Sequence, residues 1–359
     1  MNLRNAAGPL EPDLDPLVAE LTELDGPADL AGVWPTALVE ALGRSGVFRW
    51  ALPAEFGGAD LSRALLLARY ARVAEGSMTS AFILSQHDAA VRRLVAAGDR
   101  VVALRWLAAI GQGRKFATVG LSQLTTSKRH GDQAVRAEAV GPDRYRVDGI
   151  VPWVTAAPRA DLLVVGAAMD DGRQLLIALP SDRPGVEIRP PFQLAALQAS
   201  CTAEIECRAV EVSAHDILAG PEADVMANPA SSGTGGLETS ALALGLALAA
   251  LRGLERDGRD DLAEPSEALR GEWESLWADL LATAESRPGA PPSTAIRGRA
   301  NALVLRLTQA YLTARKGSGF LLDDPAQRWA RQALFFLVWS CPSPVARAGI
   351  RDLAGLCPA

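Results

Sequence analysis

Trp153 and Thr155 are the pair of side chains whose types and spacing first suggest chemistry. They end a run of β-forming residues that starts at Tyr145, and alternation along a strand would place both on one face. An indole and a hydroxyl that face the same pocket make a suitable wall for a flat aromatic ligand. The alternative is structural: the indole fills the core, and the threonine is simply a good strand former.

A second polar group lies earlier in the chain. The hydroxyls of Ser122, Thr125 and Thr126 come shortly before the cations of Lys128 and Arg129. Hydroxyl and cationic groups together are suitable ligands for a phosphate. The alternative is a polar loop whose charges are solvated, and the residues alone leave both interpretations open.

Composition argues against several other kinds of site. The four cysteines and three histidines show no metal-binding spacing, so we expect no metal centre. A net charge of −6 does not suit a nucleic-acid-binding surface. Sparse, unpatterned cysteines are typical of a cytoplasmic protein. We expect neither a signal peptide nor a membrane-spanning segment, because no apolar run is long enough.

The elements that must position these groups change character twice along the chain. Apolar residues have helical spacing up to residue 110, short β-branched runs follow to about residue 218, and helical patterns resume at Leu237. This order predicts an α+β fold whose central part has seven or eight strands. The expected domains are an N-terminal helical domain (1–112), a central antiparallel β-barrel or sandwich (113–222) and a C-terminal four-helix bundle (223–359).

The segment Glu238–Leu254 is apolar on nearly every side, so we expect a buried helix there. Its first residue carries a carboxylate, which the helix dipole favours in the first turn. Glu238 is not part of a capping box, because Gly235 occupies the position where that motif needs Ser or Thr. Arg287–Ser293 is rich in Pro and Gly and is predicted to be an exposed loop.

Four segments, in order along the chain, resemble motifs of the acyl-CoA dehydrogenase family. They are Leu52–Gly58 (compare P-E-E-Y-G-G), Gly149–Thr155 (G-x-K-x-W-I-T), Ala196–Thr202 (G-x-R-x-S-x-T) and Gly317–Ala333 (G-G-x-G-Y, then P-x-x-R-x-x-R-D-A). The resemblance extends over residues 15–355 and implies the α–β–α domain order of that family.

The resemblance also implies that FAD is the cofactor. In the family the Trp–Thr segment packs against the flavin, and the segment A-L-T-E-P-x-x-G-S-D bounds it. Here the L-T-E-P of that segment becomes Leu121–Leu124, which keeps a hydroxyl but lacks the acid and the proline. The implied cofactor contacts are Leu121, Ser122, Thr125, Trp153 and Thr155.

The catalytic base implied by the resemblance is Glu238. Most members of the family carry a glutamate near the C-terminus, in I-Y-E-G-T, but Ser340 stands there in this chain and cannot replace a carboxylate as a base. A minority place the glutamate at the start of the first helix after the β-domain, seven residues before a helix glycine. Glu238 has that spacing from Gly245. The alternative is a first-turn glutamate with no chemical role.

Two further motifs depart from the family pattern. The segment R-x-x-F-G…Q, which helps to hold the FAD of a neighbouring subunit, has no counterpart between residues 255 and 275. The segment Q-x-x-G-G-x-G has become Thr313–Gly319, in which Arg315 and Lys316 are the candidate phosphate ligands. The cross-subunit half of the cofactor site is therefore the least well matched.

The activity implied by the resemblance is α,β-dehydrogenation of an acyl thioester, carried on CoA or on a carrier protein. An electron-transfer flavoprotein or O2 would accept the electrons, and the enzyme would be a homodimer or homotetramer. Two alternatives stay open. One is a flavin-dependent monooxygenase of the same fold, which needs no glutamate base and suits Ser340. The other is a degenerate homologue that binds a partner without catalysis.

Overall fold

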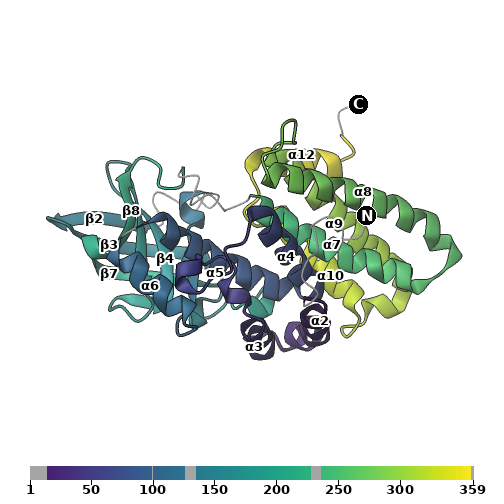
Figure 1. Cartoon of the computed structure of the whole chain (residues 1–359), viewed down its shortest axis with the longest axis horizontal. Coiled ribbons are helices and arrows are strands. Elements are labelled where there is room, and N and C mark those ends of the chain that lie inside the picture. Colours follow the sequence, from purple (N-terminus) through teal and green to yellow (C-terminus); the bar gives the residue numbers. More distant parts are fainter. Residues whose placement is uncertain (1–13, 99, 126–134, 228–235, 357–359) are drawn as a thin grey trace.

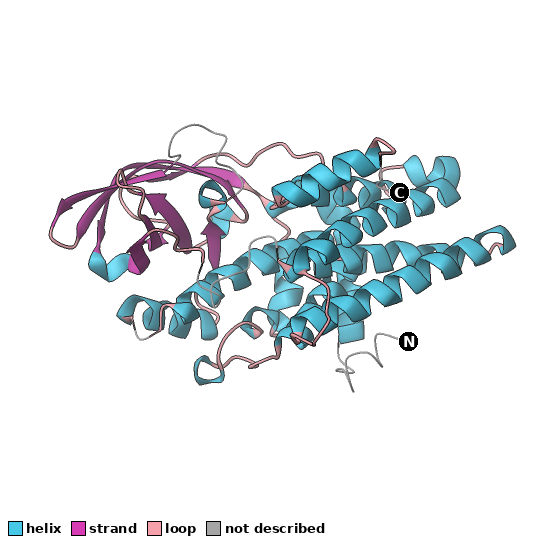
Figure 2. Ribbon diagram, turned by 90° about the horizontal axis from the view of Figure 1, so that it is seen from above, coloured by secondary structure: helices cyan, strands magenta, loops and turns pink. Residues whose placement is uncertain are grey.

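The computed structural model describes residues 14–98, 100–125, 135–227 and 236–356. Helices occupy both ends of the chain and strands occupy its middle, as the sequence predicts. Figure 1 shows the strands gathered at one end of the elongated molecule and the C-terminal helices at the other, with the N-terminal helices between them. Figure 2 shows the strands as a curved layer beside the helices.

The N-terminal helices end where the sequence changes character. They are α2 (Leu14–Ala31), α3 (Thr36–Arg44), α4 (Arg63–Gly76), α5 (Met78–Ala96) and α6 (Val101–Gly111). The turn before α4 depends on its paired glycines. Gly57 has a φ of +78°, and a Cβ on Gly58 would lie 1.8 Å from the Leu52 carbonyl oxygen. Only glycine fits such a close backbone approach.

Eight strands form one sheet with the order β6-β7-β3-β2-β4-β5-β8, and β1 pairs with β4 outside this path. The strands are β1 (Ala117–Gly120), β2 (Val135–Gly141), β3 (Arg144–Val154), β4 (Leu162–Ala168), β5 (Gln174–Pro180), β6 (Val186–Ile188), β7 (Ala203–Ser213) and β8 (Ile217–Glu222).

The sheet is mixed, whereas the sequence predicted an antiparallel one. Strand β2 meets β4 in parallel where Arg136 lies opposite Ala168, and β1 runs parallel to β4 with Ala117 opposite Leu162. Parallel neighbours need a long connection between them, and the connection from β1 to β4 includes β2 and β3. The β1 strand packs against α5 and carries the chain from the helices into the sheet.

The C-terminal helices are α7 (Leu237–Asp257), α8 (Asp260–Ala284), α9 (Ser293–Arg315), α10 (Pro325–Ala333), α11 (Phe335–Val338) and α12 (Ser343–Leu353). Helix α7 is the predicted buried helix. It is long and apolar enough to cross a membrane, but 89% of its most apolar window is buried in the protein, as in the core helix of a bundle. Gly245 lets α7 approach α4: a Cβ there would lie 2.2 Å from the Ala71 carbonyl oxygen.

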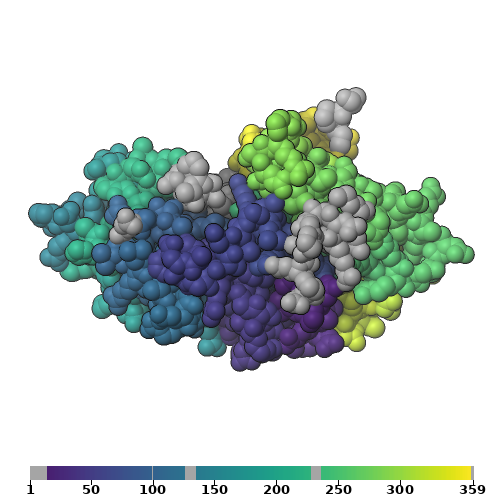
Figure 3. Space-filling model, in the orientation of Figure 1, coloured from purple at the N-terminus to yellow at the C-terminus, as the bar shows by residue number. Residues whose placement is uncertain are grey.

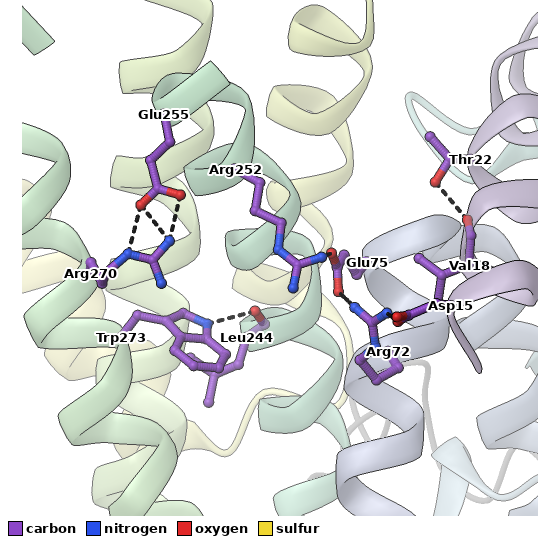
Figure 4. Close-up of polar contacts among 10 residues, drawn as sticks. All are labelled: Asp15, Val18, Thr22, Arg72, Glu75, Leu244, Arg252, Glu255, Arg270 and Trp273. Atoms are coloured by element: carbon purple, nitrogen blue, oxygen red, sulfur yellow. Dashed lines mark hydrogen bonds and ion pairs between the residues drawn. The ribbon is translucent and has the colours of Figure 1, made fainter. Parts of the chain in front are cut away.

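Ion pairs tie the two helical regions together. Figure 4 shows Glu75 of α4 between Arg72 and Arg252, which belong to α4 and α7. The same figure shows Arg270 paired with Glu255, and the Trp273 indole donating a 2.9 Å hydrogen bond to the Leu244 carbonyl oxygen.

A second set of ion pairs joins α2 to α10, far apart in the sequence. Arg328 lies 2.8 Å from Asp25, and both side chains are buried. Arg331 pairs with Asp29 in the same way. The two arginines of the motif in Gly317–Ala333 therefore hold the first helix against the last part of the bundle.

Candidate functional site

Trp153 and Thr155 do not share a face, contrary to strict alternation. Strand β3 bulges between Val151 and Val154, where one extra residue opposes β7, and Trp153 has a φ of +57°. A bulge re-aims the side chain it carries. The indole is 36% exposed and lies against the Phe192 ring at a centroid distance of 4.7 Å, whereas Thr155 is fully buried.

The Thr155 hydroxyl belongs to a buried chain of hydroxyl groups. The Thr202 hydroxyl donates to it at 3.3 Å and lies 2.9 Å from the Ser200 hydroxyl. The Thr118 hydroxyl donates to the Thr155 carbonyl oxygen at 2.8 Å. Ser200 and Thr202 come from the segment that resembles G-x-R-x-S-x-T, so two motifs meet here. This contact was not predicted from the sequence.

The loop after β1 meets the bulge that carries Trp153. The Ser122 hydroxyl donates to the Pro152 carbonyl oxygen at 3.2 Å, and Thr125 donates to the Ser122 carbonyl oxygen at 3.4 Å. Leu121 is buried beneath them. The structure therefore brings Leu121, Ser122, Thr125 and Trp153 to one place. Thr126, Lys128 and Arg129 lie outside the described residues.

Gln123 explains how the loop is held without the acid and proline of the family pattern. Its side-chain amide nitrogen donates to the carbonyl oxygens of Gly120 and Gly166, at 2.9 and 2.7 Å. These bonds tie the loop to strands β1 and β4. Gln123 therefore has a structural role in this loop.

Glu238 is the second residue of α7 and is only 7% exposed. Its Oε1 lies 4.0 Å from a terminal nitrogen of Arg92 on α5. Its Oε2 is buried and has no hydrogen-bond partner among the described residues. A buried carboxylate oxygen without a donor is costly unless something binds it.

The neighbours of Glu238 form a buried polar cluster that sequence reasoning missed. Arg92 donates to the Tyr70 hydroxyl at 3.2 Å, and Tyr70 donates to Asp88 at 2.6 Å. Burial raises the pKa of Asp88 to about 7. Arg93, beside Arg92, is 1% exposed, and burial lowers its pKa to about 9. These residues come from α4, α5 and α7, so no local sequence pattern predicts that they lie together.

Ser340 lies in a loop that an arginine anchors. It has a φ of +44°, and the preceding residues are held by the buried Arg297, which donates to the carbonyl oxygens of Phe336 and Trp339. The Trp339 ring stacks on Phe335 at a centroid distance of 5.3 Å. The position at which most of the family has its base therefore carries a half-buried serine after an anchored turn.

His87 of α5 is a core residue that is only 1% exposed. Its ring stacks on Phe116 at 4.8 Å, and Nδ1 lies 3.1 Å from the Ala117 carbonyl oxygen. Burial lowers its pKa to about 4, so the ring is neutral at physiological pH and joins α5 to β1.

The candidate cofactor residues fit the flavin ring of FAD better than they fit its phosphates. A part-exposed indole beside the Ser122 and Thr125 hydroxyls suits a flat heteroaromatic ring with polar edges. Thr155 contributes to such a site only indirectly, through the buried chain of hydroxyl groups to which it belongs. Arg315 is paired with Asp324 at 2.8 Å, so its guanidinium is already partnered. Within the described residues no group of His, Cys, Asp or Glu is arranged to hold a metal ion.

The candidate residues come from two parts of the molecule. The surface outline is indented between the strands and the C-terminal helices (Figure 3). Trp153 and Ser122 belong to the strand region, whereas Glu238 lies in the first turn of α7.

Comparisons with known proteins agree with this architecture. Residues 17–114 match the family model described as acyl-CoA dehydrogenase, N-terminal domain. A probable acyl-CoA dehydrogenase of Bacillus subtilis is 27% identical over 62% of this chain, and the match covers 60% of that relative's length. The short-chain specific acyl-CoA dehydrogenase of Rattus norvegicus is 20% identical over 94% of this chain and 85% of its own length.

Solved structures show the same fold over nearly the full length. A glutaryl-CoA dehydrogenase from Mycobacterium smegmatis in complex with FADH2 superposes with a TM-score of 0.81, at 18% identity, over 96% of this chain and 95% of that one. At this level of identity the likeness concerns the fold.

Proposed function

Because this chain belongs to the acyl-CoA dehydrogenase family, we propose that it is an FAD-dependent oxidoreductase that dehydrogenates the α,β bond of an acyl thioester. The observation that carries the proposal is Glu238, a buried carboxylate with an unpartnered oxygen at the start of α7. Such a group is suited to accept a proton from a bound substrate.

Bound FAD would supply the acceptor for the hydride that leaves the β-carbon. Leu121, Ser122, Thr125 and Trp153 would hold its ring system: the indole by stacking, the hydroxyls by hydrogen bonds, and the leucine by packing. Thr155 would stabilise the bulge that carries Trp153, through the hydrogen bond that it accepts from the Thr202 hydroxyl. Phe192 supports the indole from the side.

Glu238 would take the α-proton of the thioester onto Oε2, the oxygen without a partner. Arg92, 4.0 Å from Oε1, balances the charge of the carboxylate and limits its rotation. Tyr70 and Asp88 in turn fix Arg92. The buried position of the group excludes water from the proton transfer.

Partners and location follow as parts of the same proposal. An acyl-CoA or carrier-bound thioester is the substrate, and an electron-transfer flavoprotein or O2 takes the electrons. We propose a homodimer or homotetramer, since the family places cofactor contacts between subunits. The three described cysteines, Cys201, Cys207 and Cys341, are free thiols, which suits a reducing cytoplasm.

Glu238→Gln tests the proposal, because the amide keeps the size of the side chain but cannot accept the proton. With FAD-loaded protein under anaerobic conditions, flavin bleaching by an acyl-CoA should slow by at least about a hundredfold, while FAD content stays the same. Glu255→Gln, on the same helix but exposed, is the control and should bleach normally. Equal bleaching in wild type and Glu238→Gln would refute Glu238 as the base.

Ser340 favours a second candidate function, flavin-dependent monooxygenation. This loop carries a hydroxyl instead of a carboxylate, and monooxygenation does not require α-proton abstraction. The same variant separates the two activities. Substrate hydroxylation that depends on O2 and survives in Glu238→Gln would support the monooxygenase and contradict the dehydrogenase.

A further inference from the structure

Arg93 is a buried cation for which the described residues provide no carboxylate within bonding distance. It is 1% exposed, and one terminal nitrogen donates to the Ala89 carbonyl oxygen of its own helix at 2.9 Å. Its Nε and its other terminal nitrogen are buried without a hydrogen-bond partner. A buried guanidinium is normally paired, because removing its charge from water costs several kcal/mol. Its free donors therefore require an explanation.

The local charge is unbalanced in the positive direction. Arg92 and Arg93 are two consecutive cations, and the Glu238 carboxyl group lies 4.0 Å from Arg92. One oxygen of the Asp88 carboxyl group accepts a hydrogen bond from the Tyr70 hydroxyl. The other oxygen has no hydrogen-bond partner among the described residues. Burial raises the pKa of Asp88 to about 7, so it does not fully supply the missing negative charge.

The unbalanced charge lies beside the candidate base. Arg93 shares α5 with Arg92 and interacts electrostatically with Glu238. Guanidinium groups bind carboxylates through two parallel hydrogen bonds, and Arg93 has two adjacent nitrogens free for that purpose. An anion bound here would be part of the molecule on which Glu238 acts.

We propose that the acyl group of the substrate carries a second carboxylate, which binds the free Nε and terminal nitrogen of Arg93. The substrate is then a thioester of a dicarboxylic acid, and Arg93 determines specificity. This inference rests on the proposed function, since it uses the same site and the same base. It also explains why Arg93 is buried without a carboxylate partner in the protein.

The test compares thioesters that differ only in the terminal charge. FAD-loaded protein is titrated by calorimetry with succinyl-, glutaryl- and adipyl-CoA, and with the monocarboxylic acyl-CoAs of the same chain lengths. At least one dicarboxylic thioester should bind about thirtyfold or more tightly than its neutral counterpart, as expected for a buried charge pair. Equal binding within every pair would overturn the proposal.

Variants then assign the preference to one residue. Arg93→Met should abolish the preference for the dicarboxylic thioester, whereas Arg93→Lys should retain part of it. Arg252→Met, on α7 and paired with Glu75 away from the site, should keep the full preference. A preference that survives in Arg93→Met would refute the assignment. Should Arg93→Met not fold, the wild-type comparison and Arg93→Lys still decide.

Two further arms separate the possible outcomes. Free glutarate, added without CoA, should compete only weakly; competition as strong as that of glutaryl-CoA would overturn the thioester assignment in favour of a separate anion site. Binding does not need turnover. A protein that prefers dicarboxylic thioesters but never bleaches its flavin would refute the dehydrogenase and support this inference. Flavin bleaching by neutral thioesters alone would support the dehydrogenase and refute this inference.

Discussion

The Tyr70 hydroxyl donates a 2.6 Å hydrogen bond to Asp88, and neither side chain reaches solvent. Burial raises the pKa of Asp88 to about 7, although this hydrogen bond and the charge of Arg92 oppose the shift. The preceding residue, His87, is shifted the other way, and burial lowers its pKa to about 4. Two consecutive residues of α5 thus respond to folding with opposite changes in proton affinity.

These shifts predict opposite effects of pH on the free energy of unfolding. Between about pH 4 and 6.5 the folded protein keeps a proton on Asp88 that the unfolded chain releases, so this contribution is lost as pH rises towards 7. The unfolded chain protonates His87 in the same range, so that contribution is lost as pH falls. The two slopes cancel in the wild type.

Asp88→Asn removes the contribution of Asp88 to the pH dependence of the free energy of unfolding. Its stability relative to the wild type should rise by about 1.4 kcal/mol per pH unit between about pH 4.5 and 6.5. Urea denaturation at several pH values measures this, and His87→Gln should show the opposite trend. Parallel stability curves for Asp88→Asn and the wild type would contradict the assigned pKa of Asp88.

Glu75→Ala should destabilise the protein by about 3 kcal/mol or more, because it leaves Arg72 and Arg252 without their shared buried partner. Glu255→Ala is the matched control from the same view (Figure 4). Its ion pair with Arg270 is about one-third exposed, so its loss should cost less than about 1 kcal/mol. Chemical denaturation compares the two, and similar losses would show that burial does not set the cost.

Gly245→Ala should destabilise by about 1–3 kcal/mol, because the new Cβ would lie 2.2 Å from the Ala71 carbonyl oxygen and would force α4 and α7 apart. Gly298→Ala, in α9, meets nothing within 4 Å and should stabilise by up to about 1 kcal/mol through helix propensity alone. Thermal unfolding of both variants gives the comparison. A neutral Gly245→Ala would mean that the helices can separate without cost.

Trp153→Ala should weaken FAD binding by up to roughly tenfold, the usual value of one aromatic contact. Trp153→Phe should recover part of the affinity. Ile150→Ala, which removes an exposed side chain from the same strand, is the control and should bind FAD normally. Quenching of flavin fluorescence on binding gives the dissociation constants, and unchanged affinity in Trp153→Ala would remove the indole from the cofactor site.

Periodicity was sufficient to predict the helices and most strands, because their apolar residues recur at the spacing of each element. The buried α7 is confirmed, and the predicted loop is found up to Pro292, because Ser293 already begins α9. Strand β1 was not predicted, because four residues are too few for a periodic signal. Its parallel pairing with β4 is set by tertiary packing against α5, which no local pattern contains.

The site was harder to predict because its contacts are long-range. Alternation failed at Trp153, since a non-glycine residue with positive φ leaves no clear mark in the sequence. The Thr202–Thr155 bond joins two motifs that were considered separately. Arg92 and Glu238 are brought together only when α5 packs beside α7, so Arg93 could not be recognised as a buried cation beforehand.

The Asp25–Arg328 ion pair also bears on how the chain is synthesised. Helix α2 is synthesised before α10, and the cation that neutralises its buried carboxylate lies about three hundred residues later in the chain. Until then Asp25 must stay hydrated, which keeps α2 from docking stably on its neighbours. Helix α10 therefore completes the packing of α2, and a chain synthesised only as far as α9 would leave Asp25 without this cation.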